Sequence, residues 1–218
     1  MTTGQQPGGG FAEYQPRANR PQPGIQDQPA VEQSPGVERP LGVEQTLGVE
    51  RLSVEVRVRV RAGVRADLEA CAGLIVSRAG GSAADRRTRL VADLEDPERY
   101  IAVAEVDGEV VGYGGVIRHD LSPDDPPATA PSGYYLIGLI VAPNWRRHGI
   151  GDELTKDRMR WIAERADAAY TFVNVGNGAI LDLHQRFRFT ELTRDFTFPG
   201  APLQPGTCVL LRADLTDQ

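Results

Sequence analysis

The chain has 218 residues and a formal net charge of −6 at pH 7. This length fits one ordinary domain with an extension. Proteins that bind the phosphate backbone of nucleic acids usually carry a strong basic excess, so the negative net charge argues against a nucleic-acid partner. A membrane-spanning helix needs ~20 apolar residues, which no segment approaches, and residues 1–10 lack the apolar centre of a secretory signal. A cytoplasmic protein without a membrane partner is therefore expected.

The number of cysteines agrees with that expectation, and the number of lysines bears on the source genome. Cys71 and Cys208 are the only cysteines, and we expect both as small buried apolar side chains in a reducing compartment rather than as a disulfide. Lys156 is the only lysine, and every other residue in the combined count of lysine and arginine is an arginine. This preference for arginine suggests a GC-rich bacterial genome.

Residues 1–52 differ in composition from the rest of the chain. They are rich in Pro, Gly, Gln and Glu, and such a segment buries too little apolar surface to offset chain entropy, which predicts a disordered N-terminal extension. A Gly-Val-Glu triplet recurs every six residues, at positions 36, 42 and 48. Short turns that carry prolines could not form the core of a β-helix, so the repeat is interpreted as a low-complexity linker. The folded domain is expected over residues 53–215.

The first elements of this domain are predicted from hydrophobic periodicity. Valine alternates with charged residues over 54–61, which is the period of a half-exposed strand. Residues 66–78 carry apolar side chains along one helical face. Ser82 followed by Asp85 resembles a capping box, and it predicts a second helix that ends near Leu94.

A hairpin and a long loop follow. Strands are predicted over 100–106 and 109–117, joined at Asp107-Gly108, which is a strong hairpin signal. The loop over 118–132 carries four prolines. It is too long for a passive connection, so we interpret it as a functional lid.

The stretch from 136 to 154 organises the domain. An apolar run over 136–141 predicts a buried strand that stops at Pro143, because proline has no N–H for a ladder hydrogen bond. A basic turn with Gly149 and Gly151 follows, and a helical pattern continues to about residue 168. A ligand can approach glycine backbone closely, and the first N–H groups of a helix lie at the positive end of its dipole. The stretch therefore predicts a site for a phosphate-bearing ligand.

Two other nucleotide-binding motifs do not fit this turn. A P-loop would end in Gly-Lys-Ser/Thr, and the turn contains neither a lysine nor a hydroxyl side chain. A dinucleotide-binding fingerprint would need a third glycine where Leu154 stands.

The remaining elements complete the predicted fold. Strands are expected over 170–175, 189–198 and 208–211, and a short helix over 177–187. The order β-α-α-β-β-β-α-β-α-β-β predicts a mixed α/β (α+β) fold with a central, mostly antiparallel sheet flanked by helices.

Two segments resemble motifs of the GNAT superfamily of N-acetyltransferases. Residues 141–151 read VAPNWRRHGIG and are similar to the family's acetyl-CoA-binding motif, Pro-x-x-Arg-x-x-Gly-x-Gly between a strand and a helix. Residues 177–189 read NGAILDLHQRFRF and are similar to a family segment that runs from Asn to Gly-Phe, with Ile180 one place early. Arg188 replaces the glycine, at a cost of about 1 kcal/mol if the backbone is unchanged. The resemblance covers roughly residues 54–215 and implies a GNAT-like fold.

The resemblance implies that acetyl-CoA, the acyl donor, lies between the strands over 136–141 and 170–175. Backbone groups of the first strand would pair with the pantetheine arm, and N–H groups of the turn would hold the pyrophosphate. The implied contacts are Leu139, Ile140, Val141, Arg146, Arg147, His148, Gly149, Ile150, Gly151, Asp152 and Asn177. Asn177 would bond near the reacting end of the cofactor, although it could equally be a plain helix N-cap or serve both roles.

The resemblance also points to candidate catalytic residues: His184, Glu105 and Tyr135. Many family members place a tyrosine near the leaving thiolate, and His184 stands there instead; an unperturbed pKa of about 6.5 would let it donate or accept a proton near neutrality. Tyr135 stands where some members keep a glutamate base, and it cannot serve as a base at pH 7. Candidate replacements for that base are Glu105, His119 and His184. Polarisation of the thioester can come from a backbone N–H of the central strand.

The expected activity is acetyl transfer from acetyl-CoA to a primary amine of a small molecule or a protein N-terminus, by a monomer or homodimer and without a metal. At about pH 7.4 a lysine amine with a pKa of about 10.4 is neutral about one part in a thousand, and an α-amine with a pKa of ~7.7–8.0 roughly a quarter of the time. A site that lacks a strong general base therefore favours α-amines. Two alternatives stay open: a catalytically silent acyl-CoA-binding module, and an extension that carries the domain to a partner.

Overall fold

The fold is given by a computed structural model that describes residues 41–43 and 54–216. Most of the predicted disordered extension, residues 1–52, and most of its repeat therefore lie outside the described residues. Within that segment, Leu41–Val43 forms strand β1, which pairs antiparallel with β2, Val54–Val56. The boundary between extension and domain stays a prediction.

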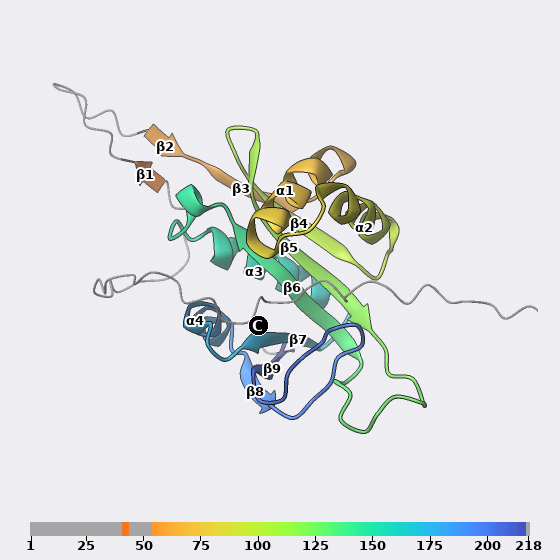
Figure 1. The fold of residues 1–218 in the computed structure, drawn as a ribbon. Helices are drawn as coiled ribbons and strands as arrows, with labels where there is room; N and C mark the ends of the chain where they lie inside the picture. The colour runs from red at the N-terminus through yellow and green to blue at the C-terminus, as the bar shows by residue number, and fades with distance from the viewer. Residues whose placement is uncertain (1–40, 44–53, 217–218) are drawn as a thin grey trace, which may run out of the picture.

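The centre of the domain is a seven-stranded sheet in the order β3-β4-β5-β6-β7-β9-β8 (Figure 1). Its strands are β3 Val58–Ala62, β4 Tyr100–Val106, β5 Glu109–His119, β6 Gly133–Val141, β7 Ala168–Asn174, β8 Thr190–Thr193 and β9 Cys208–Asp214. Neighbouring strands are antiparallel except β6 and β7, which run parallel. The predicted mixed α/β fold with a mostly antiparallel sheet is confirmed.

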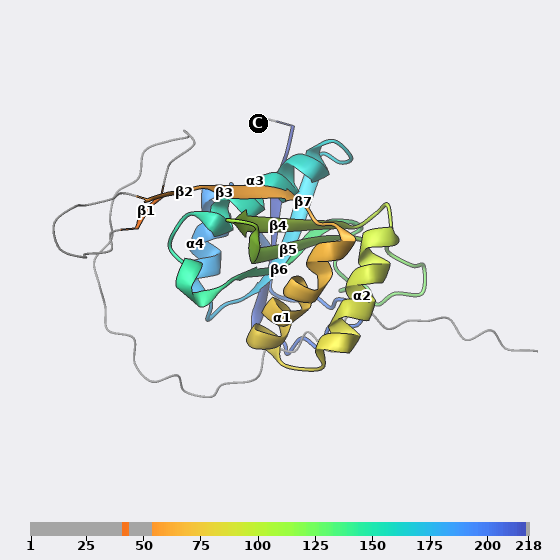
Figure 2. The same ribbon diagram turned by 90° about the horizontal axis from the view of Figure 1, so that it is seen from above.

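Helices cover both faces of this sheet (Figure 2). They are the short 3-10 helices η1 Arg65–Asp67 and η2 Pro143–Trp145, and the α-helices α1 Leu68–Ala79, α2 Ala83–Glu95, α3 Ile150–Ala163 and α4 Gly178–Arg186. Alternate residues of a strand point to opposite faces. On β4, Ile101 and Val103 accordingly pack with α1 and α2, whereas Ala102 and Ala104 pack with α3. In the part of the chain that the structure describes, no helix is long and apolar enough to cross a membrane.

Both cysteines are buried free thiols, as expected. Cys71 lies in α1 within the core between α1, α2 and the sheet. Burial raises the pKa of its thiol to about 12. Neither cysteine is therefore placed for redox chemistry, which favours exposed thiols of low pKa.

The capping and turn signals are confirmed. Ser82 Oγ accepts a hydrogen bond from the Asp85 N–H at 3.4 Å at the start of α2. The hairpin between β4 and β5 turns through Asp107 and Gly108, with φ angles of 50° and 84°, the left-handed pair of a type I′ turn. After α4, Arg188 has a φ of 60°. The backbone therefore keeps a left-handed conformation at this position even though the residue is not glycine.

Two predicted element boundaries are wrong at the edges of the domain. The strand expected over 54–61 is interrupted at Arg57, which separates β2 from β3. The helix expected to about residue 168 ends at Ala163. Residues 164–167 are mostly exposed and polar, and among them only Ala166 packs against the core. They therefore bury too little apolar surface to extend the helix.

A third boundary is wrong because tertiary packing outweighs strand propensity. The strand expected over 189–198 shrinks to β8, Thr190–Thr193. Phe196 and Phe198 instead turn inward and join a buried aromatic cluster with Tyr135. These large apolar rings bury more surface in the cluster than they could on an edge strand.

The long loop that follows β5 is fastened to the C-terminal part of the chain. The Ala130 N–H donates to the Thr197 oxygen at 2.9 Å, and the Thr197 N–H donates to the Ala128 oxygen at 2.8 Å. Ala130 itself is buried. These contacts favour a fixed connection over the lid that its length suggested.

Candidate functional site

Strands β6 and β7 separate in the middle of the sheet. Their parallel ladder ends at the pair Tyr135 and Tyr170. One further link follows, in which Thr171 Oγ1 donates to the backbone oxygen of Leu136 at 3.0 Å. Beyond it, residues 137–141 of β6 have no ladder partner on β7. The Ile137 and Val141 oxygens accept hydrogen bonds from Arg158 and Arg146. The other backbone groups on that side are available to an extended ligand. We call this gap in the ladder the β6–β7 opening.

A bulge marks the start of this opening. The register of β5 against β6 shifts between Tyr113 and Gly115, and on β6 Gly138 has a φ of 63°. A Cβ at position 138 would lie 3.0 Å from Cε1 of Tyr113. Both the backbone angle and the close ring require glycine here. The bulge re-aims the part of β6 that borders the opening.

The turn after β6 presents backbone donors at the end of the opening. Gly149 is the N-cap of α3 and is left-handed, with a φ of 75°. Across the described ranges, no protein acceptor pairs with the N–H groups of residues 149–152, and the next amide, of Glu153, returns to the Gly149 oxygen at 3.1 Å. These free donors lie at the positive end of the helix dipole, an arrangement that favours a negatively charged ligand, and we call this group of donors the anion site.

The side chains of the turn have several roles. Arg146 and Arg147 are exposed, and Arg146 Nε donates to the Val141 oxygen at 3.2 Å. His148 is half-buried against Trp145, with ring centroids 5.9 Å apart. The two arginines can therefore add positive charge to the anion site from its solvent side.

Other residues that were predicted to contact the cofactor could do so only through their backbone groups. The side chains of Ile140 and Ile150 are buried in the core. Asp152 is held by Arg186 of α4, with Nη2 2.8 Å from Oδ1. Its carboxylate joins two helices, and only its N–H faces the anion site.

Gly151 sits where α3, α4 and β6 meet. A Cβ at this position would lie 3.8 Å from Leu139 Cδ2 and from Leu183 Cδ2. This is ordinary contact, so a small side chain would fit, whereas a long one would have to enter the opening. Leu139 itself is only partly buried.

Asn177 occupies the N-cap position of α4. Its backbone oxygen accepts from the N–H groups of Ile180 and Leu181, each at 3.1 Å. Its side chain makes no capping hydrogen bond. Asn177 is therefore the N-cap residue that one alternative expected, but it caps through its backbone oxygen, and its half-buried side-chain amide is left for another partner.

His184 is buried between α4 and the core. Its Nδ1 lies 2.8 Å from the Ile180 oxygen, and its ring meets Phe189 edge-on at 5.0 Å. Burial, with a smaller effect of the Arg158 charge, lowers its pKa to about 4. The expectation of a proton donor near neutrality is wrong: the neutral ring uses its N–H on Ile180. Within the described residues, the buried Nε2 has no hydrogen-bond partner.

Tyr135 is a core residue. Its ring is fully buried and stacks on Tyr170, with centroids 5.2 Å apart. Its hydroxyl donates to the Pro131 oxygen at 2.6 Å. Burial raises the pKa of this hydroxyl. As a candidate catalytic residue it is wrong, because it stays protonated and its proton is already engaged.

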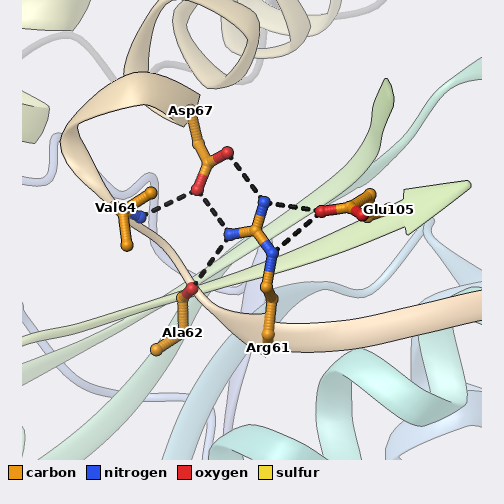
Figure 3. Close-up of polar contacts among 5 residues, drawn as sticks. All are labelled: Arg61, Ala62, Val64, Asp67 and Glu105. Carbon is orange, nitrogen blue, oxygen red and sulfur yellow. Dashed lines mark hydrogen bonds and ion pairs between the residues drawn. The ribbon is translucent and has the colours of Figure 1, made fainter. Parts of the chain in front are cut away.

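Glu105 belongs to an ion-pair network that involves β3, β4 and the segment before α1 (Figure 3). Arg61 of β3 bonds Glu105 Oε2 at 2.7 Å and Asp67 of η1 at 2.6 Å. Asp67 also accepts from the Val64 N–H at 2.8 Å. Glu105 lies on β4, two strands from β6. Its carboxylate is held by Arg61, which also binds Asp67 at the start of α1, so Glu105 is not free to act as the candidate base.

His119 does not reach the opening as an available base either. Its Nε2 lies 3.0 Å from the Ala130 oxygen. Its ring packs against Phe198, with centroids 4.9 Å apart. The histidine therefore helps to hold the loop that follows β5.

Arg158 was missed by the sequence reasoning. It lies on α3, is 1% exposed, and reaches the β5–β6 bulge, where its Nη1 donates to the Ile137 oxygen at 3.1 Å and to the Gly115 oxygen at 3.3 Å. Burial lowers its pKa to about 10, which leaves it charged at neutral pH. A signal existed in the sequence, because position 158 falls between Leu154 and Ile162 on the buried face of the helix.

Comparisons with known proteins agree with this geometry. The sequence model of the Acetyltransferase (GNAT) family matches residues 69–189. An N-alpha-acetyltransferase of Sulfurisphaera tokodaii is 32% identical over 105 residues, which are 47% of this chain and 63% of the relative. The chain thus spans less than two thirds of the length of that relative.

Solved structures share the fold. The ribosomal-protein-alanine N-acetyltransferase from Brucella melitensis has a TM-score of 0.57 and 22% identity, over 72% of this chain and 99% of that one. The protein yncA from Salmonella typhimurium, solved with its cofactor acetyl-CoA, has a TM-score of 0.57 and 16% identity, over 74% of this chain and 95% of that one. At these identities the likeness concerns the fold alone.

Proposed function

This chain belongs to the GNAT family of acetyltransferases, and on that premise we propose that it transfers the acetyl group of acetyl-CoA to a primary amine. One observation carries the proposal. The single parallel pair of the sheet, β6 and β7, opens beyond Tyr135 toward the free N–H groups of residues 149–152. An extended arm that ends in phosphates fits that combination of unpaired strand edge and anion site.

The residues present fit acetyl-CoA, which supplies the acetyl group as an activated thioester. The N–H groups of 149–152 would bind its pyrophosphate, with added charge from Arg146 and Arg147. Peptide groups of residues 137–141 would hold the pantetheine arm as a short added strand. The uncommitted amide of Asn177 would bond the arm from the α4 side.

The acceptor that best suits this site is an α-amine. His184 is buried with a lowered pKa, the Tyr135 hydroxyl donates to Pro131, and Glu105 is ion-paired. The predicted residues therefore supply no strong base. An α-amine with a pKa of ~7.7–8.0 is partly neutral at about pH 7.4 and needs less help than a lysine amine with a pKa of about 10.4. The similarity to an N-alpha-acetyltransferase supports the same class of acceptor.

Two matched peptides test this proposal with the full chain and acetyl-CoA. One peptide has a free N-terminus and no lysine, and the other has a blocked N-terminus and one lysine. We expect CoA release and a single added acetyl group, detected by mass spectrometry, with the first peptide only. Acetylation of the lysine peptide alone would overturn the choice of α-amines.

A catalytically silent acyl-CoA-binding module is the second candidate. It is favoured by the same engaged side chains of His184, Tyr135 and Glu105. Acetyl-CoA binding in calorimetry, together with no CoA release for peptides or for a panel of small amines, would support the silent module over the enzyme.

A further inference from the structure

We infer that Arg158 stabilises the thiolate of CoA at the β6–β7 opening, so that the leaving sulfur departs as an anion and needs no proton from the protein. The inference rests on the proposed function. In that transfer, the bond between the acetyl carbon and sulfur breaks and its electron pair stays on sulfur. A carbon–nitrogen bond forms, and the proton lost by the amine passes to solvent.

The guanidinium of Arg158 is a buried cation with only neutral partners. Besides Ile137 and Gly115, its Nε donates to the Leu154 oxygen at 3.1 Å and its Nη2 to Thr155 Oγ1 at 3.2 Å. No carboxylate lies within ion-pair distance of it among the described residues. A buried charge is costly unless an opposite charge or strong hydrogen bonds compensate it. The cation is thus hydrogen-bonded but has no ion-pair partner among the described residues.

The position of Arg158 matches the reacting end of the cofactor site. Helix α3 returns along β6: its first turn meets Leu139 at Gly151, and Arg158 meets Ile137. Arg158 lies eight residues beyond Ile150, which is about 12 Å along a helix axis. The anion site and the cation therefore stand at opposite ends of the opening. A ligand with phosphates at one end and sulfur at the other would place the sulfur near Arg158.

The sheet is built to admit this side chain. A Cβ at Gly114 would lie 2.9 Å from Arg158 Nε, so β5 leaves the space that the guanidinium occupies. At the bulge, the backbone oxygen of Gly115 on β5 also accepts a hydrogen bond from Arg158 Nη1. A purely structural reading is that Arg158 satisfies carbonyl groups that the bulge leaves unpaired. That reading predicts no effect on a bound thiol.

The titratable groups around Arg158 come from three elements. They are Tyr113 of β5, Asp157 of α3 and His184 of α4. Asp157 accepts from the Tyr100 hydroxyl at 2.7 Å and pairs with Arg160, so its charge has other partners. His184 is neutral at pH 7, since its pKa is about 4. The positive charge of Arg158 is therefore the dominant charge among these groups.

The experiment compares CoA with desulfo-CoA, which lacks the thiol, by calorimetry on the full chain between about pH 6.5 and pH 9.5. A free thiol has a pKa of about 8.5, as in cysteine. If the site prefers the thiolate, the bound thiol has a lower pKa, and the affinity for CoA relative to desulfo-CoA rises with pH. The rise is about tenfold for each unit by which the pKa is lowered.

Variants assign the effect to the charge. Arg158→Gln keeps a hydrogen-bond donor but should abolish the rise, and Arg158→Lys should retain part of it. Lys156→Gln is the matched control, because Lys156 is an exposed cation on the same helix, and it should behave like the wild type.

The wild type alone can overturn the inference, even if Arg158→Gln fails to fold. An affinity ratio that does not change with pH would leave Arg158 as a structural residue, while the proposed function would stand. If neither CoA nor desulfo-CoA binds, both the proposed function and this inference fail.

Discussion

Thr171 Oγ1 donates a hydrogen bond to the backbone oxygen of Leu136 at 3.0 Å, one residue beyond the last ladder pair of β6 and β7. The Thr171 side chain thus replaces a backbone donor at the point where the strands separate. Both residues are buried, so no bulk water can take over the bond. This contact defines the closed end of the β6–β7 opening.

Thr171→Val should destabilise the fold by ~1–3 kcal/mol, because it leaves the buried Leu136 oxygen without a donor while keeping the branched shape. Urea unfolding measures the change, and acetyl-CoA affinity should fall with it. Thr190→Val on the exposed edge strand β8 is the control and should change little. Equal stability of both variants would show that the Thr171 bond does not hold the two strands.

Gly151→Glu should abolish stabilisation by acetyl-CoA. With ligand at a hundredfold over its dissociation constant, the wild type should gain ~2.7 kcal/mol of unfolding free energy. The glutamate puts a side chain and a negative charge beside the anion site, where bare backbone is needed. Gly73→Glu is the matched control, since Gly73 is exposed on α1 with open space around it. Undiminished ligand stabilisation in Gly151→Glu would refute the anion site.

Arg188→Gly should stabilise the protein by about 1 kcal/mol. Arg188 is exposed and has a φ of 60°, a conformation that glycine adopts without the Cβ clash of other residues. Thermal unfolding measures the gain. Arg188→Ala removes the same charge but keeps a Cβ, so it should give no gain. A similar effect of both substitutions would mean that charge, rather than backbone strain, matters here.

Stability below neutral pH should depend on His184. Its folded pKa of about 4 lies below the unfolded value of 6.5, so the unfolded chain takes up the proton first as pH falls. The free energy of unfolding should therefore decrease from about pH 6.5 to about pH 4, by up to ~1.4 kcal/mol per pH unit, and then level off. His184→Phe should lose this part of the slope. Parallel pH profiles for the two proteins would contradict the lowered pKa.

The backbone conformation of the turn between β6 and α3 could be predicted from the sequence because its signals are local. Pro143 ends the strand, Gly149 supplies the left-handed N-cap, and helix periodicity resumes at once. The hairpin at Asp107-Gly108 and the cap at Ser82 were predictable for the same reason. Each depends on the conformation of a few neighbouring residues.

The chemistry of the site could not be predicted in this way. The lowered pKa of His184 depends on burial against Phe189 and on the charge of Arg158, which are contacts between elements. Tyr135 lies on β6, one residue before the predicted strand over 136–141. Its partners, Pro131 and Tyr170, come from a loop and from the next strand. Residue type suggests a reactive group, and only packing decides its proton affinity.

Amide NMR on the full chain tests the central claim that the β6–β7 opening and the α3 N-terminus form one acetyl-CoA site. On addition of acetyl-CoA, we expect the largest amide shifts at residues 149–152 and at residues 137–141, the free donors of the helix and the unpaired edge of β6. Desulfo-CoA should reproduce the shifts at 149–152. Shifts confined to other elements, with both of these segments unchanged at saturation, would contradict the site.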